Sequence, residues 1–436
     1  MKKLKETKSI CGKCQRVVPA ETFEEGGRVF LRSKCPTCGE VTEDHVWDDP
    51  EIYAGMCQVK VLPGRADQII VDITRKCNLN CRVCFANANG YQGNNFEEID
   101  LEKIREYQIV FLSGGEPTTR EDLPEIVKHS RKNGQGPLVF TNGIKLAQKA
   151  YVKKLQEAGL RSVLLQFDTL KEEDSEYIRG RKLVETKKRA LQNLEKFEIP
   201  TTVWTVIFGD KNIEDIKEIH DFLLGFSNVR TVSAIPIWRV GKFKKEDFVP
   251  PSRIIEKLCE IYGLEKKDFV ETTKLVCNID RFLAVFSKQK NRLFGKCMVK
   301  ALVFPYQGKY VSLGKIFNLP RLNSEIDKVV ASKQKKGRAL AFLGTFFFRD
   351  VLLNFFKNKI MRAVVLQLVF NLRHFFDKRF LLISPFRFIT VGIFPNRNNI
   401  DLDFIEPCNS HALSLDDYSI RPACLHYIFE DKKNGN

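Results

Sequence analysis

The chain has 436 residues, of which 43% are hydrophobic and 29% are charged. This composition excludes a disordered tail protein, a collagen-like fibre and a coiled-coil rod, and the length predicts two to three domains. The 71 Lys and Arg against 54 Asp and Glu give a net charge of +17, which favours anionic partners such as phosphate, nucleic acid or acidic lipid. The first residues are charged and no apolar stretch follows them, so we expect no secretory signal. Because the 13 cysteines then indicate metal ligands before disulfides, their spacing is the main clue.

Two CxxC pairs open the chain, Cys11 with Cys14 and Cys35 with Cys38. The residues 21–32 between them are predicted to form a hairpin whose turn contains two glycines. Two tight turns bridged by a hairpin can bring four thiolates to the corners of a tetrahedron, as in a zinc ribbon or rubredoxin. Four thiolates suit zinc and iron equally. The alternative is a pair of disulfides in a secreted module, which the missing export signal disfavours.

A third group of cysteines follows a buried-strand pattern at residues 68–74. Cys77, Cys81 and Cys84 have the spacing C-x3-C-x2-C. Three thiolates leave a four-iron cluster unsaturated, because each iron needs its own outer ligand. The open iron can chelate a small molecule through an amine and a carboxylate. The alternative is a zinc ion held by these three cysteines and a distant fourth ligand.

This loop, with Asp72 and Thr74 before the cysteines and Phe85-Ala86 after them, resembles the radical S-adenosylmethionine (SAM) superfamily. The resemblance implies that Cys77, Cys81 and Cys84 hold a [4Fe-4S] cluster whose open iron binds SAM. It also implies reductive cleavage of SAM to a 5'-deoxyadenosyl radical, which abstracts hydrogen from an unreactive carbon. Val83 stands where the family usually has an aromatic residue, and we expect apolar contact with the adenine to survive.

Further family features follow the next strands. The strand 109–112 ends in Ser-Gly-Gly-Glu-Pro, where glycines let backbone approach a ligand closely. The resemblance implies that Gly114, Gly115 and Glu116 bind the methionyl amine of SAM, and Asn142 lies in a turn similar to the family's third strand end. Gln166 and Asp168 flank the fourth strand end and are candidates to bind the SAM ribose or the substrate. Helix capping is the alternative for the aspartate.

The core alternates between strands and helices. Strands are expected at 68–74, 109–113, 137–141, 162–167, 201–207 and 229–235, with helices near 101–107, 121–132, 145–158, 173–197 and 213–225. This order predicts an α/β fold whose right-handed crossovers curl into a partial (βα)6 barrel, the fold that the resemblance also implies. The candidate residues then share the edge formed by the strand C-termini. We expect a metal-binding module at 1–50, a core at 51–245 and a mainly helical C-terminal extension at 246–436.

Six cysteines remain outside the two groups above. An auxiliary four-iron cluster takes about four thiolates, and six are too few for two such clusters. We expect Cys277, Cys297, Cys408 and Cys424 to hold one auxiliary [4Fe-4S] cluster, because all four follow the barrel. Buried free thiols are the alternative.

A basic, Phe-rich segment occupies residues 339–380, and residues 342–380 hold ten of the 34 Phe. Charges interrupt its apolar runs well short of ~18 residues, so we expect two shorter helices and no transmembrane span. The segment is either helical core or an apolar substrate channel or membrane-surface patch. No recognised motif for reading nucleic acid is present, so we expect no nucleic-acid partner.

The order of a four-cysteine module, the cysteine loop and an extended tail is similar to archaeal tetraether lipid synthase and its homologues, some once assigned as pterin methylases. The similarity covers residues 8–240, and residues 421–427 resemble the family's cysteine-bearing C-terminal segment. The chain ends soon after, which leaves the number of auxiliary clusters open.

The resemblance implies a lipid substrate joined through carbon–carbon bonds, and an electron donor such as ferredoxin or flavodoxin. We expect a cytoplasmic location, peripheral on the inner face of the membrane. The alternatives are radical modification of a pterin-like heterocycle or a peptide, and a non-catalytic iron–sulfur or zinc scaffold.

Overall fold

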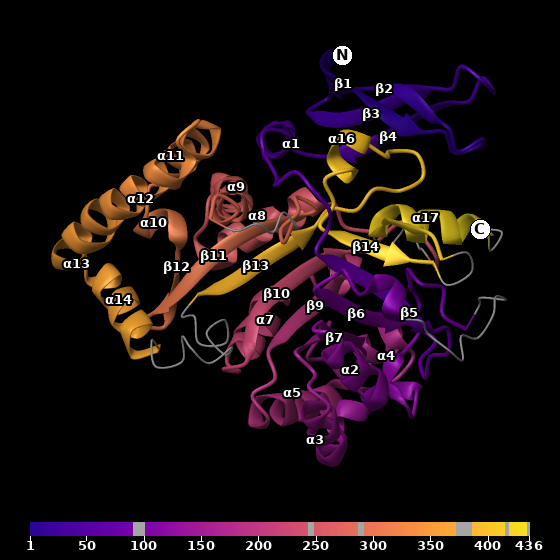
Figure 1. Cartoon of the computed structure of the whole chain (residues 1–436). Coiled ribbons are helices and arrows are strands. Elements are labelled where there is room, and N and C mark those ends of the chain that lie inside the picture. The colour runs from indigo at the N-terminus through magenta and orange to yellow at the C-terminus, as the bar shows by residue number, and fades with distance from the viewer. Residues whose placement is uncertain (90–100, 243–247, 287–291, 372–385, 415–417, 434–436) are drawn as a thin grey trace.

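A computed structural model describes residues 1–89, 101–242, 248–286, 292–371, 386–414 and 418–433. One large sheet runs through the middle of the molecule (Figure 1). Its strands are β5 Gln68–Thr74, β6 Ile109–Gly114, β7 Gly136–Thr141, β8 Ser162–Gln166, β9 Thr201–Ile207, β10 Val229–Pro236, β11 Met298–Tyr306, β12 Lys309–Ser312, β13 Arg387–Gly392, β14 Ser410–Leu413 and β15 Ile420–Pro422.

The strand order is β12-β11-β13-β10-β9-β8-β7-β6-β5-β14-β15. All pairs from β13 to β14 are parallel, whereas β11, β12 and β15 join antiparallel at the two edges. The six parallel strands expected from the sequence are confirmed as β5 to β10. The sequence did not indicate that C-terminal strands would extend the sheet at both ends.

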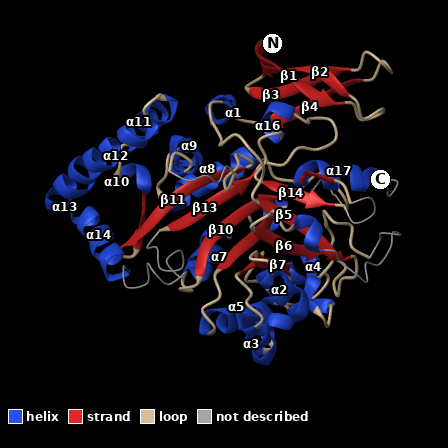
Figure 2. Ribbon diagram, viewed as in Figure 1, coloured by secondary structure: helices blue, strands red, loops and turns tan. Residues whose placement is uncertain are grey.

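Helices accompany the parallel strands as expected of βα units. They are α1 Pro50–Cys57, η1 Leu101–Ile104, η2 Pro117–Thr119, α2 Leu123–Lys132, η3 Lys145–Ala147, α3 Lys149–Glu157, α4 Glu172–Arg179, α5 Val184–Lys196, α6 Gly209–Asn212 and α7 Ile216–Leu224. Figure 2 shows α2, α3, α5 and α7 along one side of β6 to β10. The single helix expected over 173–197 is two helices, because Gly180 ends α4 in the left-handed conformation at φ +73°.

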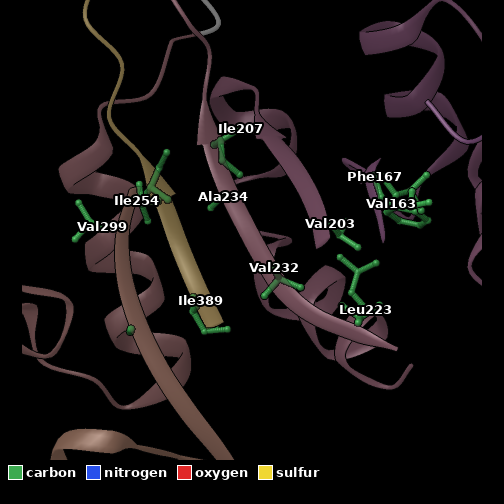
Figure 3. Close-up of a cluster of buried hydrophobic side chains, with 14 of the residues drawn as sticks. Val163, Phe167, Val203, Ile207, Leu223, Val232, Ala234, Ile254, Val299 and Ile389 are labelled. Carbon is green, nitrogen blue, oxygen red and sulfur yellow. The ribbon is translucent and has the colours of Figure 1, made fainter. Parts of the chain in front are cut away.

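The main hydrophobic core lies between the sheet and these helices. Val203, Val232 and Ile389 are neighbours in register on β9, β10 and β13, and all three are fully buried (Figure 3). Each such side chain contributes about 1.5–3 kcal/mol when removed from water. Because Ile389 comes from the last quarter of the chain, the C-terminal extension shares one core with the barrel.

The N-terminal module is a separate four-stranded antiparallel sheet in the order β1-β2-β3-β4. Its strands are β1 Lys2–Ile10, β2 Val17–Glu25, β3 Arg28–Lys34 and β4 Val41–Trp47. Gly26 and Gly27 both have positive φ, as the two-residue turn of the predicted hairpin requires. Asn396 and Asn399 donate side-chain hydrogen bonds to Asp44 and to the His45 carbonyl, each at 2.7 Å, and attach the module to the C-terminal region.

The C-terminal extension contains the expected helices. They are α8 Pro251–Tyr262, α9 Lys266–Leu283, α10 Leu313–Ile316, α11 Leu319–Ala331, α12 Lys335–Phe346, the π-helical turn η5 Phe347–Leu352, α13 Leu353–Lys357, α14 Lys359–Asn371, α16 Leu402–Ile405 and α17 Ala423–Lys433.

The Phe-rich segment forms two helices, as expected, although residues 372–380 lie outside the described residues. The first runs unbroken from Lys335 to Lys357 and is long and apolar enough, by length and composition, to cross a membrane. The sequence analysis expected no such helix. Arg349 and Asp350 are the only charged residues between Ala339 and Phe356, so the interruption is slight.

Candidate functional site

A cavity of about 350 Å³ lies at the C-terminal ends of the parallel strands. Its wall includes the cysteine loop, the Gly114–Glu116 turn, Asn142 and Gln166. Residues that the sequence analysis placed on one edge of the sheet therefore do meet around one space. This is where parallel α/β barrels carry their chemistry.

Cys77, Cys81 and Cys84 all line this cavity. Their sulfurs do not all lie within 4.8 Å of one another, whereas the four ribbon cysteines meet that limit. A single tetrahedral zinc holds its sulfurs about 3.8 Å apart, given Zn–S bonds of about 2.3 Å. The wider spacing suits a larger cluster better than one ion. Burial raises the pKa of Cys77 to about 11.

The two glycines of the predicted SAM motif serve the cysteine loop. A Cβ on Gly114 would lie 2.1 Å from the Thr74 carbonyl oxygen, and one on Gly115 would lie 2.2 Å from that of Lys76. The Gly115 N–H donates to Thr74 at 2.7 Å and the Glu116 N–H donates to Lys76 at 2.8 Å. The glycines therefore let β6 bind the backbone of the loop directly. Both also line the cavity, so their contact with the SAM amine remains a prediction.

Glu116 is fully buried, and its carboxylate joins two turns. Oε1 accepts hydrogen bonds from Thr118 and Thr141, and Oε2 accepts one from the Asn142 N–H at 2.8 Å. Burial raises the pKa of Glu116, although these hydrogen bonds oppose the shift. Because a carboxylate has about four acceptor sites, Oε2 keeps capacity for an ammonium group. The predicted contact with the SAM amine is compatible with this geometry.

Two asparagines fix the shape of the cysteine loop. The Asn142 amide donates to Asn78 Oδ1 at 2.8 Å and so ties the β7 turn to the loop. Asn89 accepts from the Cys77 N–H at 2.9 Å and donates to the carbonyls of Cys77 and Leu79. Asn89 is not among the residues predicted from the sequence. Its positive φ of +65° is a conformation that asparagine tolerates better than most residues.

Asp168 lies beneath the cavity wall and does not cap a helix. It accepts from the Val206 N–H at 2.9 Å and from Arg179 Nε at 2.7 Å. Gln166 lines the cavity, donates to Asp168 and accepts from Lys187. Asp168 therefore positions Arg179, whereas Gln166 remains the candidate for ligand contact.

Arg179 is the main functional candidate that the sequence analysis missed. Burial opposes its charge, but Asp168 and Cys81 raise the pKa of the guanidinium. It lines the cavity, and its Nη2 is buried without a hydrogen-bond partner among the described residues. A buried cation beside a cluster cysteine fits an anionic group such as the SAM carboxylate. The only sequence signal was its place at the Gly180 break.

Two distant segments close around the loop. Lys242 and Cys84 exchange backbone hydrogen bonds of 3.0 and 3.2 Å, and a Cβ on Gly241 would lie 2.3 Å from the Cys84 carbonyl oxygen. From α17, the Tyr427 hydroxyl donates to Asp72 Oδ1 at 3.0 Å, and Glu430 accepts from Arg75 at 3.2 Å. The C-terminal helix therefore belongs to the site.

The auxiliary-cluster candidates are brought together in part. Cys297, Cys408 and Cys424 line the same cavity as the cysteine loop. Cys277 is buried in α9 and does not line the cavity, but it lies close enough to Cys297 for that thiol to contribute to its raised pKa, after burial. The grouping remains a prediction, with three cysteines at the wall and the fourth behind them.

The four ribbon cysteines converge as predicted. Cys11 and Cys38 sulfurs lie 3.5 Å apart, and those of Cys14 and Cys35 lie 3.6 Å apart. Backbone N–H groups lower the pKa of Cys35 to about 6, because they stabilise the thiolate that a metal binds. The donors and their spacing fit one zinc or iron ion.

Comparison with known proteins agrees with this geometry. The profile of the Radical SAM superfamily matches residues 71–223, and that of the HMPTM N-terminal zinc ribbon domain matches residues 3–48. A 7,8-dihydro-6-hydroxymethylpterin dimethyltransferase of Methanocaldococcus jannaschii is 36% identical over 242 residues, which are 47% of each chain. An Fe-coproporphyrin III synthase of Methanosarcina barkeri is 30% identical over 164 residues, covering 36% of this chain and 40% of that one.

Among solved structures, Streptococcus suis SuiB bound to S-adenosylmethionine has a TM-score of 0.40 and 19% identity, over 46% of this chain and 48% of that one. At that TM-score the likeness supports no argument about this chain. The chain spans about half the length of the curated relatives it matches.

Proposed function

We propose that this chain is a radical SAM enzyme with an N-terminal zinc ribbon, and that it abstracts hydrogen from an apolar lipid to form a carbon–carbon bond. Cys77, Cys81 and Cys84 would hold the [4Fe-4S] cluster. The cluster and SAM together supply a 5'-deoxyadenosyl radical. Glu116 and Arg179 would hold the amine and carboxylate of SAM, and Gln166 would contact its ribose or the substrate.

The lining of the cavity carries the lipid proposal. Its charged lining residues in the described chain are Glu116, Arg179 and Lys242, and each already bonds to protein groups. Beyond them the wall is mainly apolar and aromatic, with polar side chains such as Ser113, Asn142 and Asn409 between the others. Phe140 contacts Phe111 at 5.1 Å and Trp204 at 5.5 Å between ring centroids. Such a wall rewards burial of hydrocarbon. Its two cations are engaged, Lys242 by Asn80 and Arg179 by Asp168, and the remaining Nη2 of Arg179 is the group proposed for the SAM carboxylate.

A pterin-like heterocycle is the second candidate substrate. The 36% identical relative is named for a hydroxymethylpterin, and the matching ribbon profile carries the abbreviation HMPTM. A flat heterocycle could stack on Phe140 or Trp204. Polar side chains such as Ser113 and Asn409 on the same wall could satisfy its ring nitrogens.

We propose one auxiliary [4Fe-4S] cluster at Cys297, Cys408 and Cys424, with Cys277 as the fourth ligand. Its support is the placement of three thiols on the wall of the cavity that the cysteine loop also lines. Cys424→Ala should then lower the iron content by about four per chain. Cys57→Ala, a half-buried cysteine outside the cavity, is the matched control. Equal iron content in both variants would leave the four cysteines as free thiols.

An acidic electron donor of the ferredoxin or flavodoxin type and a location at the cytoplasmic face of a membrane complete the proposal. The net charge of +17 supports both, because it favours an acidic protein partner and an acidic lipid surface.

The test is anaerobic turnover by the reduced enzyme with SAM. We expect 5'-deoxyadenosine together with a coupled or modified product when isotopically labelled isoprenoid or fatty lipid is supplied. No lipid product, with turnover of a pterin or a peptide, would replace the lipid proposal. No 5'-deoxyadenosine with any substrate would contradict the radical mechanism itself.

The variant Phe140→Asn sharpens this test. A polar group on the aromatic wall should lower lipid turnover at least about tenfold, while SAM cleavage without substrate stays unchanged. Phe222→Asn is the matched control, because Phe222 is also half-buried but lies on α7 and does not line the cavity. Equal loss in both variants would assign the effect to folding.

A further inference from the structure

The helical arm, formed by α12, η5, α13 and α14 (Lys335–Asn371), presents an apolar face to solvent. Seven large apolar side chains of the arm are between 41% and 69% exposed: Leu340, Leu343, Phe347, Phe348, Leu353, Phe356 and Leu366. Phe348 and Leu353 are five residues apart, which the π-helical turn η5 places on one face. A contiguous exposed face of this kind marks an interaction surface.

The opposite face of the arm is fixed to the protein. Ala339 is fully buried in a cluster with α11, and the rings of Phe342 and Phe346 contact Phe282 and Phe317 at 5.5 and 5.7 Å. On α14, Met361 and Val364 are buried against β11 and α10. The arm is therefore held as a rigid unit with one side covered.

A buried ion pair holds the middle of the long helix. Asp350 is 2% exposed, pairs with Arg321 of α11 and accepts from Arg349, which also binds Glu325 at 2.9 Å. Inserting this helix across a bilayer would break the ion pair between Asp350 and Arg321 and would bury charged side chains in hydrocarbon. The arm can lie on a membrane but is not free to span one.

Cations surround the apolar face. Lys333, Lys335, Lys336 and Arg338 precede it, and Lys357, Lys359 and Arg362 follow η5, all exposed and none in an ion pair with a described residue. Asp350, which is buried, is the only acidic residue between Lys328 and Phe376. Apolar side chains framed by unbalanced cations match the boundary between anionic lipid head groups and acyl chains.

We propose that the helical arm docks the enzyme on an anionic lipid bilayer, with its exposed Phe and Leu side chains inserted among the acyl chains. A second copy of this chain is the poorer occupant, because pairing two arms would oppose two sets of cations. The arm lies at the β12 edge of the sheet, far from α17, so docking leaves the C-terminal helix untouched (Figure 1). The proposed lipid substrate gives this docking a purpose, but binding does not depend on turnover.

The test is co-sedimentation of the full chain with sucrose-loaded vesicles. We expect binding to vesicles of 70% phosphatidylcholine and 30% phosphatidylglycerol, and much weaker binding to pure phosphatidylcholine. The triple variant F347S/F348S/F356S should bind at least about tenfold more weakly. The variant K335Q/K336Q/R338Q should lose roughly a hundredfold at low salt.

The matched control is V17S/V41S, which removes two valines, each 60% exposed, from the distant ribbon. It should bind as the unchanged chain does, and all variants should keep their iron content. Equal binding of the Phe variant, or equal binding to neutral vesicles, would overturn the proposal. A lipid-free dimer that F347S/F348S/F356S dissociates would assign the face to self-association instead. Because no step uses SAM, a failed lipid turnover and a failed vesicle binding are distinct results.

Discussion

The ribbon and the cysteine loop are both cysteine-rich, yet their sulfurs are spaced differently. The ribbon sulfurs already lie 3.5 and 3.6 Å apart. Local N–H groups lower the pKa of Cys35 to about 6, whereas burial and the neighbouring ribbon thiols raise the pKa of Cys38. In the loop the sulfurs are wider apart, and burial raises the pKa of Cys77 to about 11.

The two cysteine sites differ because their turns are held in place by different parts of the chain. Each ribbon turn is closed by its own backbone, as where the Gln15 N–H donates to the Cys11 carbonyl at 3.0 Å. The loop is held by Asn89, which follows it closely in the chain, and by more distant segments that include Gly115 and Lys242. A single-ion site can therefore form locally, whereas a cluster site with an open iron needs the whole barrel to hold a loop that also leaves room for a ligand.

The largest expected effect separates the two metal sites by function. Cys81→Ala should abolish 5'-deoxyadenosine formation, because two protein thiolates do not retain the cluster in a form that binds SAM. Cys35→Ser should release the ribbon metal and leave the cluster iron and SAM cleavage largely in place. Iron, zinc and 5'-deoxyadenosine are measured on both. Persistent SAM cleavage in Cys81→Ala would refute the assignment of the loop.

The next largest effect is expected where a glycine lets backbone pack closely against the cysteine loop. Gly115→Ala places a Cβ 2.2 Å from the Lys76 carbonyl oxygen, so the loop must shift and the cluster iron should fall by half or more. Gly12→Ala is the matched control, since nothing lies within 4 Å of its Cβ position in the ribbon turn. Full cluster loading in Gly115→Ala, measured by iron analysis and absorption spectra, would contradict the close approach of β6.

A smaller effect concerns the ligand. Arg179→Lys loses the planar guanidinium that binds Asp168 and faces the cavity, so the Kd for SAM should rise by about tenfold. Arg181→Lys changes an exposed arginine two residues away and should leave the Kd unchanged. Equilibrium dialysis with the reconstituted enzyme measures both. An unchanged Kd in Arg179→Lys would make the residue a structural partner of Asp168 alone.

The smallest effect concerns the C-terminal helix. Tyr427→Phe removes the 3.0 Å hydrogen bond to Asp72 and should destabilise the docking of α17 by about 1 kcal/mol. Amide hydrogen exchange in α17 should then speed up by about fivefold. Tyr418→Phe, at an exposed tyrosine, serves as the control. Equal exchange rates in the two variants would show that α17 is held by its apolar contacts.

Features with short-range causes could be read from the residues alone. The two CxxC turns, the C-x3-C-x2-C loop and the six parallel strands depend on local spacing and on alternation along the chain, and all are found where expected. The edge shared by Glu116 and Asn142 also followed, because parallel strands end on the same side of a sheet.

Other features arise only when distant segments meet. Gly180 breaks an expected helix and thereby turns Arg179 toward Cys81, and strands β13 and β14 extend the sheet from the far end of the chain. Cys297 just before β11, Cys408 just before β14 and Cys424 on α17 all reach the cavity. The exposed face of the helical arm depends on Asp350 facing α11. The spacing of residues along the chain shows which side chains are able to bind a metal or contact lipid. Packing between elements hundreds of residues apart decides which of them share a wall and which face solvent.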